Sequence, residues 1–281
     1  MPFLLWNRPG WHRIKSIIPK MGWNPRFMKL IALIPARYGS TRFPGKPLAP
    51  ILGKPLIQRV YEQARLVAGL DELWVATDDE RIRACVEGFR GRALLTRAGH
   101  LSGSDRLAEA AQLLGLAPAD LVVNIQGDQP VFPPELVGQL AALLRRDPEV
   151  VMATPARKFT DPRVAADPNV VKVVFDRRGR ALYFSRSPLP CWFPVSSARD
   201  AAAAGYFYRH LGIYAYRVGF LQEFVKLPPG RWEQAEKLEQ LRALEHGFPI
   251  HIVETEGDTL EVDTPADLAR AEAHFASGLK D

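Results

Sequence analysis

Short apolar segments alternate with amphipathic segments through the first half of the chain. Buried strands are predicted at 29–35, 72–77, 93–96 and 121–126, and helices at 55–68, 79–87, 104–114 and 133–145. Strands that alternate with helices in this way pair in parallel, because each helix carries the chain back to the same edge of the sheet. The pattern therefore predicts a parallel sheet with helices on both faces.

The second half of the chain has fewer predicted helices between its predicted strands. Strands are predicted at 150–155, 170–175, 180–184, 211–216 and 250–254, a loop at 187–208, and helices at 232–246 and 264–275. We expect this half to form a partly antiparallel lid or wall of the same compact unit. Residues 29–281 are therefore predicted to be a single domain.

The positive charge of the chain is confined to its beginning. The formal net charge is +6, but residues 1–29 hold six Lys and Arg and no Asp or Glu. The remainder is neutral, which argues against a nucleic-acid partner for the domain. We interpret residues 1–28 as a poorly ordered basic extension, and we expect its removal to leave turnover intact.

The cysteines and the apolar runs limit where such a protein works. Cys85 and Cys191 are far apart and form no C-x-x-C motif, which argues against a disulfide scaffold or a zinc site. No apolar run reaches the roughly 18–20 residues that span a bilayer, and residues 1–29 do not read as a signal peptide. A reducing, cytoplasmic setting without a transmembrane segment fits these features.

A basic, glycine-containing loop follows the first predicted strand. Gly39 and Gly45 allow the backbone to bend toward a polyanion, and Arg37, Arg42 and Lys46 add positive charge. Ligands of parallel α/β sheets bind at the carboxyl ends of the strands, where this loop lies. The loop suits a triphosphate, although its spacing fits neither the Walker A motif nor G-x-G-x-x-G.

This loop and four further segments resemble the 3-deoxy-manno-octulosonate cytidylyltransferases (CMP-KDO synthetases). The matching segments are IPARYGSTRFPGKPL at 34–48, HLSGSDRLAE at 100–109, VNIQGDQP at 123–130, ALYFSRSPLP with RHLGIYAYR at 181–190 and 209–217, and KLEQLRALEHG with VDTPADL at 237–247 and 262–268. Together they span most of the chain in the family's order. Three departures stand out: Gln129 occupies a position where the family usually carries Glu, the turn between the last two motifs is unusual, and residues 1–29 have no expected counterpart.

The resemblance implies a Rossmann-like α/β fold of the nucleotide-diphospho-sugar transferase type, with a mixed, mostly parallel sheet. It also implies a homodimer that joins CTP to the acidic sugar KDO, giving CMP-KDO for lipopolysaccharide synthesis and pyrophosphate. We expect the sugar's anomeric hydroxyl to attack the α-phosphorus, with Arg37 and Lys46 neutralising the charge that develops. We identify no required general base.

The candidate site residues fall into three groups. Asp128, after a strand and a glycine, and Asp263, before a helix, match the family's metal positions and suit Mg²⁺. The nucleotide-binding candidates are Arg37, Ser40, Lys46, Arg97, Ser102, Gly103, Arg106 and Gln126. The sugar-site positions that the resemblance implies are Arg186, His210, Tyr214, Glu239 and Gln240.

Other functions stay open at this point. A cytidylyltransferase for sialic acid or for an amino-substituted KDO would use the same fold, as would a nucleotidyltransferase for neutral sugar phosphates. The last of these needs a second cluster of cations, and the second half of the chain shows no clear one. A non-enzymatic nucleotide-sensing or nucleic-acid-binding module would instead depend on the basic extension.

Overall fold

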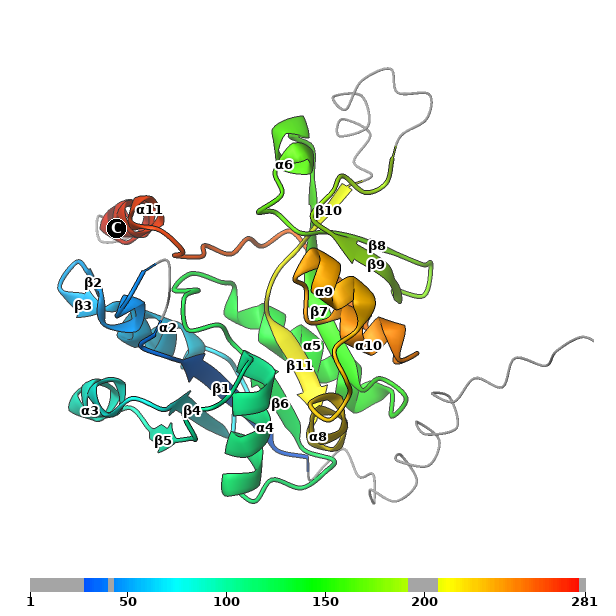
Figure 1. Cartoon of the computed structure of the whole chain (residues 1–281). Coiled ribbons are helices and arrows are strands. Elements are labelled where there is room, and N and C mark those ends of the chain that lie inside the picture. The colour runs from blue at the N-terminus through cyan, green and yellow to red at the C-terminus, as the bar shows by residue number, and fades with distance from the viewer. Residues whose placement is uncertain (1–27, 40–42, 192–206, 278–281) are drawn as a thin grey trace, which may run out of the picture.

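The computed structural model describes residues 28–39, 43–191 and 207–277. Its main element is a ten-stranded mixed sheet with strand order β5-β4-β1-β6-β11-β7-β10-β8-β9, in which β12 pairs with β7 (Figure 1). The predicted Rossmann-like fold with helices on both faces is thereby confirmed. The predicted extension at residues 1–28 lies outside the described residues apart from Met28.

The N-terminal half of the chain forms the parallel part of the sheet. Strands β1 (Leu30–Ala36), β4 (Glu72–Thr77), β5 (Ala93–Leu95) and β6 (Leu121–Asn124) run in one direction. The helices of this half are α2 (Leu56–Ala64), α3 (Glu80–Gly88), α4 (Gly103–Leu113) and α5 (Pro134–Arg146). All eight elements lie where the apolar pattern predicts them, with boundary shifts of a few residues.

Alternate side chains of β1 enter two separate cores. Leu30, Ala32 and Ile34 pack with α2, α3 and α5 on one face of the sheet. Ile31 and Leu33 pack on the other face with α4, with α8 (Val218–Phe224) and with α10 (Leu241–Glu245). A strand exposes successive side chains to opposite faces, so a continuous apolar run such as β1 must be covered on both.

The C-terminal half supplies the mostly antiparallel part of the sheet. Strands β7 (Met152–Phe159), β8 (Lys172–Phe175), β9 (Ala181–Ser185), β10 (Phe207–His210) and β11 (Tyr214–Arg217) pair antiparallel with their neighbours. The exception is β12 (His251–Thr255), which runs parallel to β7. The short helix α6 (Pro162–Ala166) and the strands β8 and β9 lie at one end of the molecule, opposite β5 (Figure 1).

Two predictions for this half are wrong in detail. The strand predicted at 211–216 is Tyr214–Arg217, because Ile213 N bonds to Leu211 O at 2.7 Å in a tight turn, and a separate strand, β10, precedes it. The single helix predicted at 232–246 is two helices, α9 (Arg231–Glu236) and α10. Lys237 between them has a φ of 55°, which interrupts the helix.

Several short elements were not anticipated. They are the 3₁₀ helix η2 (Lys46–Leu48), the hairpin of β2 (Pro50–Ile51) and β3 (Lys54–Pro55), and the helices α6 and α8. The last helix, α11 (Pro265–Ser277), was predicted, and it contacts β2. In this position α11 brings the segment just before it, with Asp263, to the loop that follows β1.

Candidate functional site

The loop after β1 is folded back on itself. Gly45 N donates to Tyr38 O at 3.0 Å, and Gly45 has a φ of 72°, a left-handed conformation that glycine adopts without strain. The Tyr38 ring stacks under the Arg81 guanidinium, 3.4 Å from the ring centroid. Lys46 then begins η2. Ser40 and Arg42 lie outside the described residues.

Lys46 lies between the two predicted metal-binding carboxylates. Its Nζ is 2.7 Å from Asp128 Oδ2 and 3.1 Å from Asp263 Oδ1. Burial, the largest influence, lowers the pKa of Lys46, but the two aspartates together outweigh it and raise this pKa above its ordinary value. Residues 128 and 263 are distant in sequence, so this meeting is a product of the fold.

The space between Asp128 and Asp263 therefore accepts a cation. Within the described residues no group of three or more His, Cys, Asp and Glu side chains is arranged to hold a metal. Two carboxylates, with waters and substrate phosphates as further ligands, nevertheless match what Mg²⁺ takes in nucleotide sites. The donor set at this place consists of hard oxygens and fits that ion.

A cavity of about 290 Å³, the loop cavity, opens beside this cluster. Predicted residues that line it are Arg37, Lys46, Ser102, Gly103, Arg106, Gln126, Asp128 and Asp263. The N-terminus of α4 forms one wall. There Ser102 caps the helix by accepting from Asp105 N and, through its own N–H, donating to the Asp105 carboxylate.

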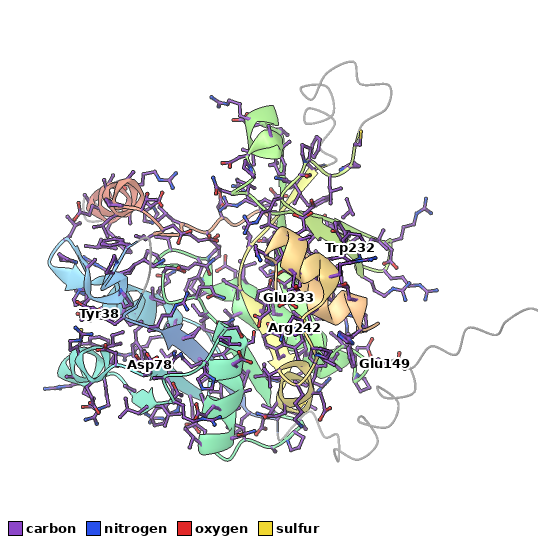
Figure 2. All side chains as sticks on the ribbon, viewed as in Figure 1. Tyr38, Asp78, Glu149, Trp232, Glu233 and Arg242 are labelled. Carbon is purple, nitrogen blue, oxygen red and sulfur yellow. The ribbon has the colours of Figure 1, made fainter. Side chains whose placement is uncertain are left out.

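Some of the nucleotide-binding candidates already have partners within the protein. Arg106 is buried and donates to Asp78 Oδ2 at 2.9 Å and to Thr96 Oγ1 at 2.5 Å, beside the loop cavity. Figure 2 shows Asp78 on the parallel side of the molecule, between β4 and α3. Arg97 does not line the loop cavity, and its guanidinium pairs with Glu109 at 3.0 Å.

A second cavity, the sheet cavity, has a volume of about 350 Å³. It lies where β6, β10 and β11 approach the α9–α10 turn, and it contains His210, Tyr214, Glu239 and Gln240 from the predicted sugar set. Arg186 does not line it. Its guanidinium donates to Glu236 O and Pro168 O, both at 2.9 Å.

The break between α9 and α10 turns Glu239 and Gln240 inward. Arg242 donates to both carboxylate oxygens of Glu233, at 2.8 and 2.6 Å, and this pair holds the two short helices together (Figure 2). Ser104 Oγ donates to Glu239 Oε2 at 2.8 Å, whereas Glu239 Oε1 is buried and makes no hydrogen bond within the described residues. Glu239 Oε1 lies 3.7 Å from Arg242 Nη2, so an ion pair also holds this carboxylate in place.

Burial sets the protonation of the groups in the sheet cavity. Burial, followed by the Arg209 charge, lowers the pKa of His210 to about 3, so its ring is neutral near pH 7. Burial likewise raises the pKa of Tyr214 and keeps its hydroxyl protonated. Burial also raises the pKa of Glu239, with Ser102 and Ser104 opposing that shift. The cavity offers neutral hydrogen-bonding groups and an acidic side chain.

The two cavities are adjacent. Gly103, Gln126 and Asp128 line both of them. Gln126 Nε2 donates to Gly212 O at 3.3 Å, which ties the end of β6 to the turn before β11. A ligand in the loop cavity and one in the sheet cavity would therefore meet beside Asp128.

Sequence reasoning missed several residues that line these cavities. His100 in the loop cavity, and Asn124, Arg209 and Glu261 in the sheet cavity, were not among the candidates. Each lies within two residues of a candidate or in one of the quoted segments, so adjacency along the chain was the available signal. Their side-chain directions depend on the fold.

Comparison with known proteins shows a consistent likeness. A sequence model described as "Cytidylyltransferase" matches residues 31–254. A 3-deoxy-manno-octulosonate cytidylyltransferase of Syntrophobacter fumaroxidans is 56% identical, covering 86% of this chain and 94% of that protein. An 8-amino-3,8-dideoxy-manno-octulosonate cytidylyltransferase of a Shewanella species is 52% identical, covering 89% of this chain and 100% of that protein.

Solved structures show the same likeness. The structure of a CMP:2-keto-3-deoxy-manno-octonic acid synthetase complexed with CTP superposes with a TM-score of 0.81 at 45% identity, covering 89% of this chain and 99% of the other. A 4-diphosphocytidyl-2C-methyl-D-erythritol synthase of Anaerococcus prevotii shares the fold alone, with a TM-score of 0.56 at 18% identity over 93% of this chain and 99% of the other. None of the helices in the described residues is long and apolar enough to cross a membrane.

Proposed function

The chain belongs to the cytidylyltransferase family, and on that premise we propose that it transfers CMP from CTP to the anomeric hydroxyl of 3-deoxy-D-manno-octulosonate (KDO). The products are CMP-KDO, a donor for lipopolysaccharide synthesis, and pyrophosphate. One observation carries this proposal: two cavities of suitable chemistry share a wall that contains Asp128. The relative whose structure contains CTP supports the choice of nucleotide.

We assign CTP to the loop cavity. Arg37 and Lys46 line it and would neutralise the triphosphate, while the first turn of α4 presents backbone N–H groups to an anion. Lys46 Nζ, held between Asp128 and Asp263 without a nucleotide, is close enough to the shared wall to serve a phosphate there. Charge on the α-phosphate and on the departing pyrophosphate would be offset at this point.

We propose that Asp128 and Asp263 hold Mg²⁺ when the nucleotide is bound. The bound ion would polarise the α-phosphate and lower the pKa of the sugar's hydroxyl. The carboxylates already surround a cation in the form of the Lys46 ammonium, which supports the assignment. Lys46 would then donate to phosphate oxygens instead.

We assign the sugar to the sheet cavity. Tyr214, Glu239 and Gln240 line it and carry groups that can hydrogen-bond hydroxyl groups. Arg209 also lines this cavity; its guanidinium pairs with Asp258 at 3.3 Å, and we propose that it contacts the sugar's carboxylate when the sugar is bound. With the sugar held here, its anomeric hydroxyl would approach the α-phosphorus across the shared wall, and positioning would supply much of the rate.

Two finer expectations belong to the same proposal. A homodimer is expected from the family resemblance, and sedimentation of the purified protein would test it. A cytoplasmic location suits an enzyme that consumes CTP, and the two cysteines in the structure, Cys85 and Cys191, are free thiols.

The amino-substituted sugar is the alternative that the comparisons raise. The relatives named for KDO and those named for its 8-amino analogue differ little in identity, at 56% and 52%. An 8-ammonium group would meet a carboxylate such as Glu239 as readily as a hydroxyl would. The acid sugar itself must therefore be tested directly.

Pyrophosphate release is the measurement that tests this function. Purified protein with Mg²⁺ would be given CTP, UTP, GTP or ATP, each with KDO, 8-amino-KDO, sialic acid or glucose 1-phosphate. We expect release with CTP and KDO, and none from an Asp128→Ala variant. Release with CTP and another acid sugar would support the proposed reaction but identify a different sugar substrate. If folded protein released no pyrophosphate with any pair, the proposal that it is an enzyme of this kind would be refuted.

A further inference from the structure

A hydrogen bond joins the two segments that carry Asp128 and Asp263. Gln129 directly follows Asp128, and Glu261 lies two positions before Asp263. Gln129 Nε2 donates to Glu261 Oε1 at 2.8 Å. The side chain of Gln129 is fully buried, and Glu261 is partly buried. This contact spans 132 positions of sequence, so it exists only because the two segments lie side by side.

Backbone hydrogen bonds continue this connection. Val262 N donates to Asp128 O at 2.9 Å, and Leu260 N donates to Val131 O at 3.0 Å. Val131 and Leu260 form a short antiparallel bridge. The segments that carry the two aspartates are thus joined by a short ladder of two backbone hydrogen bonds and the Gln129–Glu261 side-chain hydrogen bond. Any change in that ladder alters the distance between their carboxylates.

The Gln129 amide has little freedom to move. A Cβ at Gly212 would lie only 3.3 Å from Gln129 Nε2, so the backbone of Gly212 packs closely over the amide. Gln129 Oε1 is buried and makes no hydrogen bond within the described residues. The bond to Glu261 is therefore what orients this side chain among the described residues.

We propose that Gln129 and Glu261 are a positioning pair that sets the separation of the Asp128 and Asp263 carboxylates, and thereby the affinity of the site for a divalent cation. This inference rests on the metal site proposed above. Groups that contact metal ligands without touching the metal orient those ligands, and changing them typically costs about 10- to 100-fold in metal affinity. Gln129 and Glu261 also line the sheet cavity, but this role requires neither of them to contact a substrate.

The variant Gln129→Glu preserves size but places a carboxylate against Glu261. Like charges at this distance repel strongly in a buried place, so the ladder should open. We expect the Mg²⁺ concentration for half-maximal pyrophosphate release to rise about tenfold. The kcat at saturating Mg²⁺ should change less. The double variant Gln129→Glu/Glu261→Gln restores a donor opposite an acceptor and should recover most of the loss.

If only the added or lost charge mattered, the metal affinity of each variant would change in a different way. An added carboxylate beside the cation site would strengthen metal binding in Gln129→Glu, and loss of the Glu261 carboxylate would weaken metal binding in Glu261→Gln. If the pair acts by position, Glu261→Gln should bind metal nearly as wild type does, because two facing amides still form a hydrogen bond. Matched surface controls are Gln234→Glu and Glu149→Gln, whose side chains are exposed (Figure 2 labels Glu149).

Direct binding of Mn²⁺ in the presence of CTP, followed by electron paramagnetic resonance, gives a readout independent of turnover. Thermal unfolding without metal reports whether each variant is folded. If Gln129→Glu fails to fold, Glu261→Gln and the double variant still distinguish position from charge. We expect weaker Mn²⁺ binding in Gln129→Glu and recovery in the double variant.

Several results would overturn this role. Unchanged or tighter Mn²⁺ binding in Gln129→Glu is one, and a double variant no better than the single variant is another. A loss of thermal stability with an unaltered metal requirement would show a merely structural contact. If the wild-type protein neither binds Mn²⁺ with CTP nor requires Mg²⁺, the proposed metal site itself fails, and the positioning role with it.

Discussion

Gly127 is the glycine whose replacement should most directly disturb the candidate site. A Cβ at this position would lie 2.7 Å from Pro35 O, about 0.7 Å short of an ordinary contact. Gly127 has no positive φ, so the reason for a glycine here is its close packing against β1. In Gly127→Ala, the end of β6 and the end of β1 must separate.

The expected cost follows from that geometry. Overpacking of this kind destabilises proteins by about 1–3 kcal/mol. Part of this destabilisation is offset, because alanine lowers the conformational entropy of the unfolded chain. That effect stabilises the folded protein by about 0.4–1 kcal/mol. The melting temperature should therefore fall by about 2–8 °C for a domain of this size. Asp128, the next residue, would shift by several tenths of an ångström, and kcat/KM should fall about 10- to 100-fold.

Calorimetry and pyrophosphate release measure these two effects separately. Gly138→Ala is the matched control, because a Cβ at Gly138 on α5 meets nothing within 4 Å. That variant should be as stable as wild type or more so, since alanine favours helix by about 1 kcal/mol, and as active. If Gly127→Ala retains both the melting temperature and the activity of wild type, the close approach does not constrain the site and the reasoning is refuted.

Three further predictions concern single side chains. Lys46→Met should lower kcat by about 10²- to 10³-fold in pyrophosphate release, because the cation beside Asp128 is lost, whereas Lys54→Met on the β2–β3 hairpin should not. Glu239→Gln should raise the KM for the sugar about 10- to 100-fold and leave the KM for CTP unchanged, because Glu239 lines the sheet cavity and not the loop cavity. An equal rise in both KM values would count against the assignment of the sugar to the sheet cavity. Burial, followed by the Arg209 charge, lowers the pKa of His210 to about 3 in the folded protein. Between about pH 6.5 and pH 3 the unfolded chain therefore binds a proton at this residue that the folded protein does not bind. The stability that is present above pH 6.5 is lost as the pH falls through this range. Urea unfolding at pH 7 and pH 5 should show a loss of about 2 kcal/mol from this group, and the loss should be smaller in His210→Gln.

The alternating pattern of the first half was sufficient to predict its architecture. Strand β1 is apolar throughout and β6 is apolar up to Asn124, and the helices between them carry one apolar face, so burial favours a covered parallel sheet. The second half was harder to predict because its short strands pair with distant partners. The pairings of β11 with both β6 and β7, and of β12 with β7, have no local signal.

The α9–α10 turn illustrates a local prediction that tertiary contacts reversed. The segment has helical spacing, yet Lys237 adopts a left-handed conformation and Leu238 is buried beside Glu239. The Arg242–Glu233 pair and the contact of Ser104 with Glu239 favour the broken form. As a result Glu239 and Gln240, which a continuous surface helix would leave solvated, line the sheet cavity.

The sequence by itself determined the covered parallel sheet, the place of the basic loop after the first strand and the residue types of the site, because these follow from apolar periodicity and from short motifs. The tertiary structure alone decided that Lys46 lies between Asp128 and Asp263, that the two cavities share a wall, and that Gln129 meets Glu261. These contacts join positions far apart in the chain. Their distances depend on strand pairing and on the packing of the segment before α11, which no local pattern encodes.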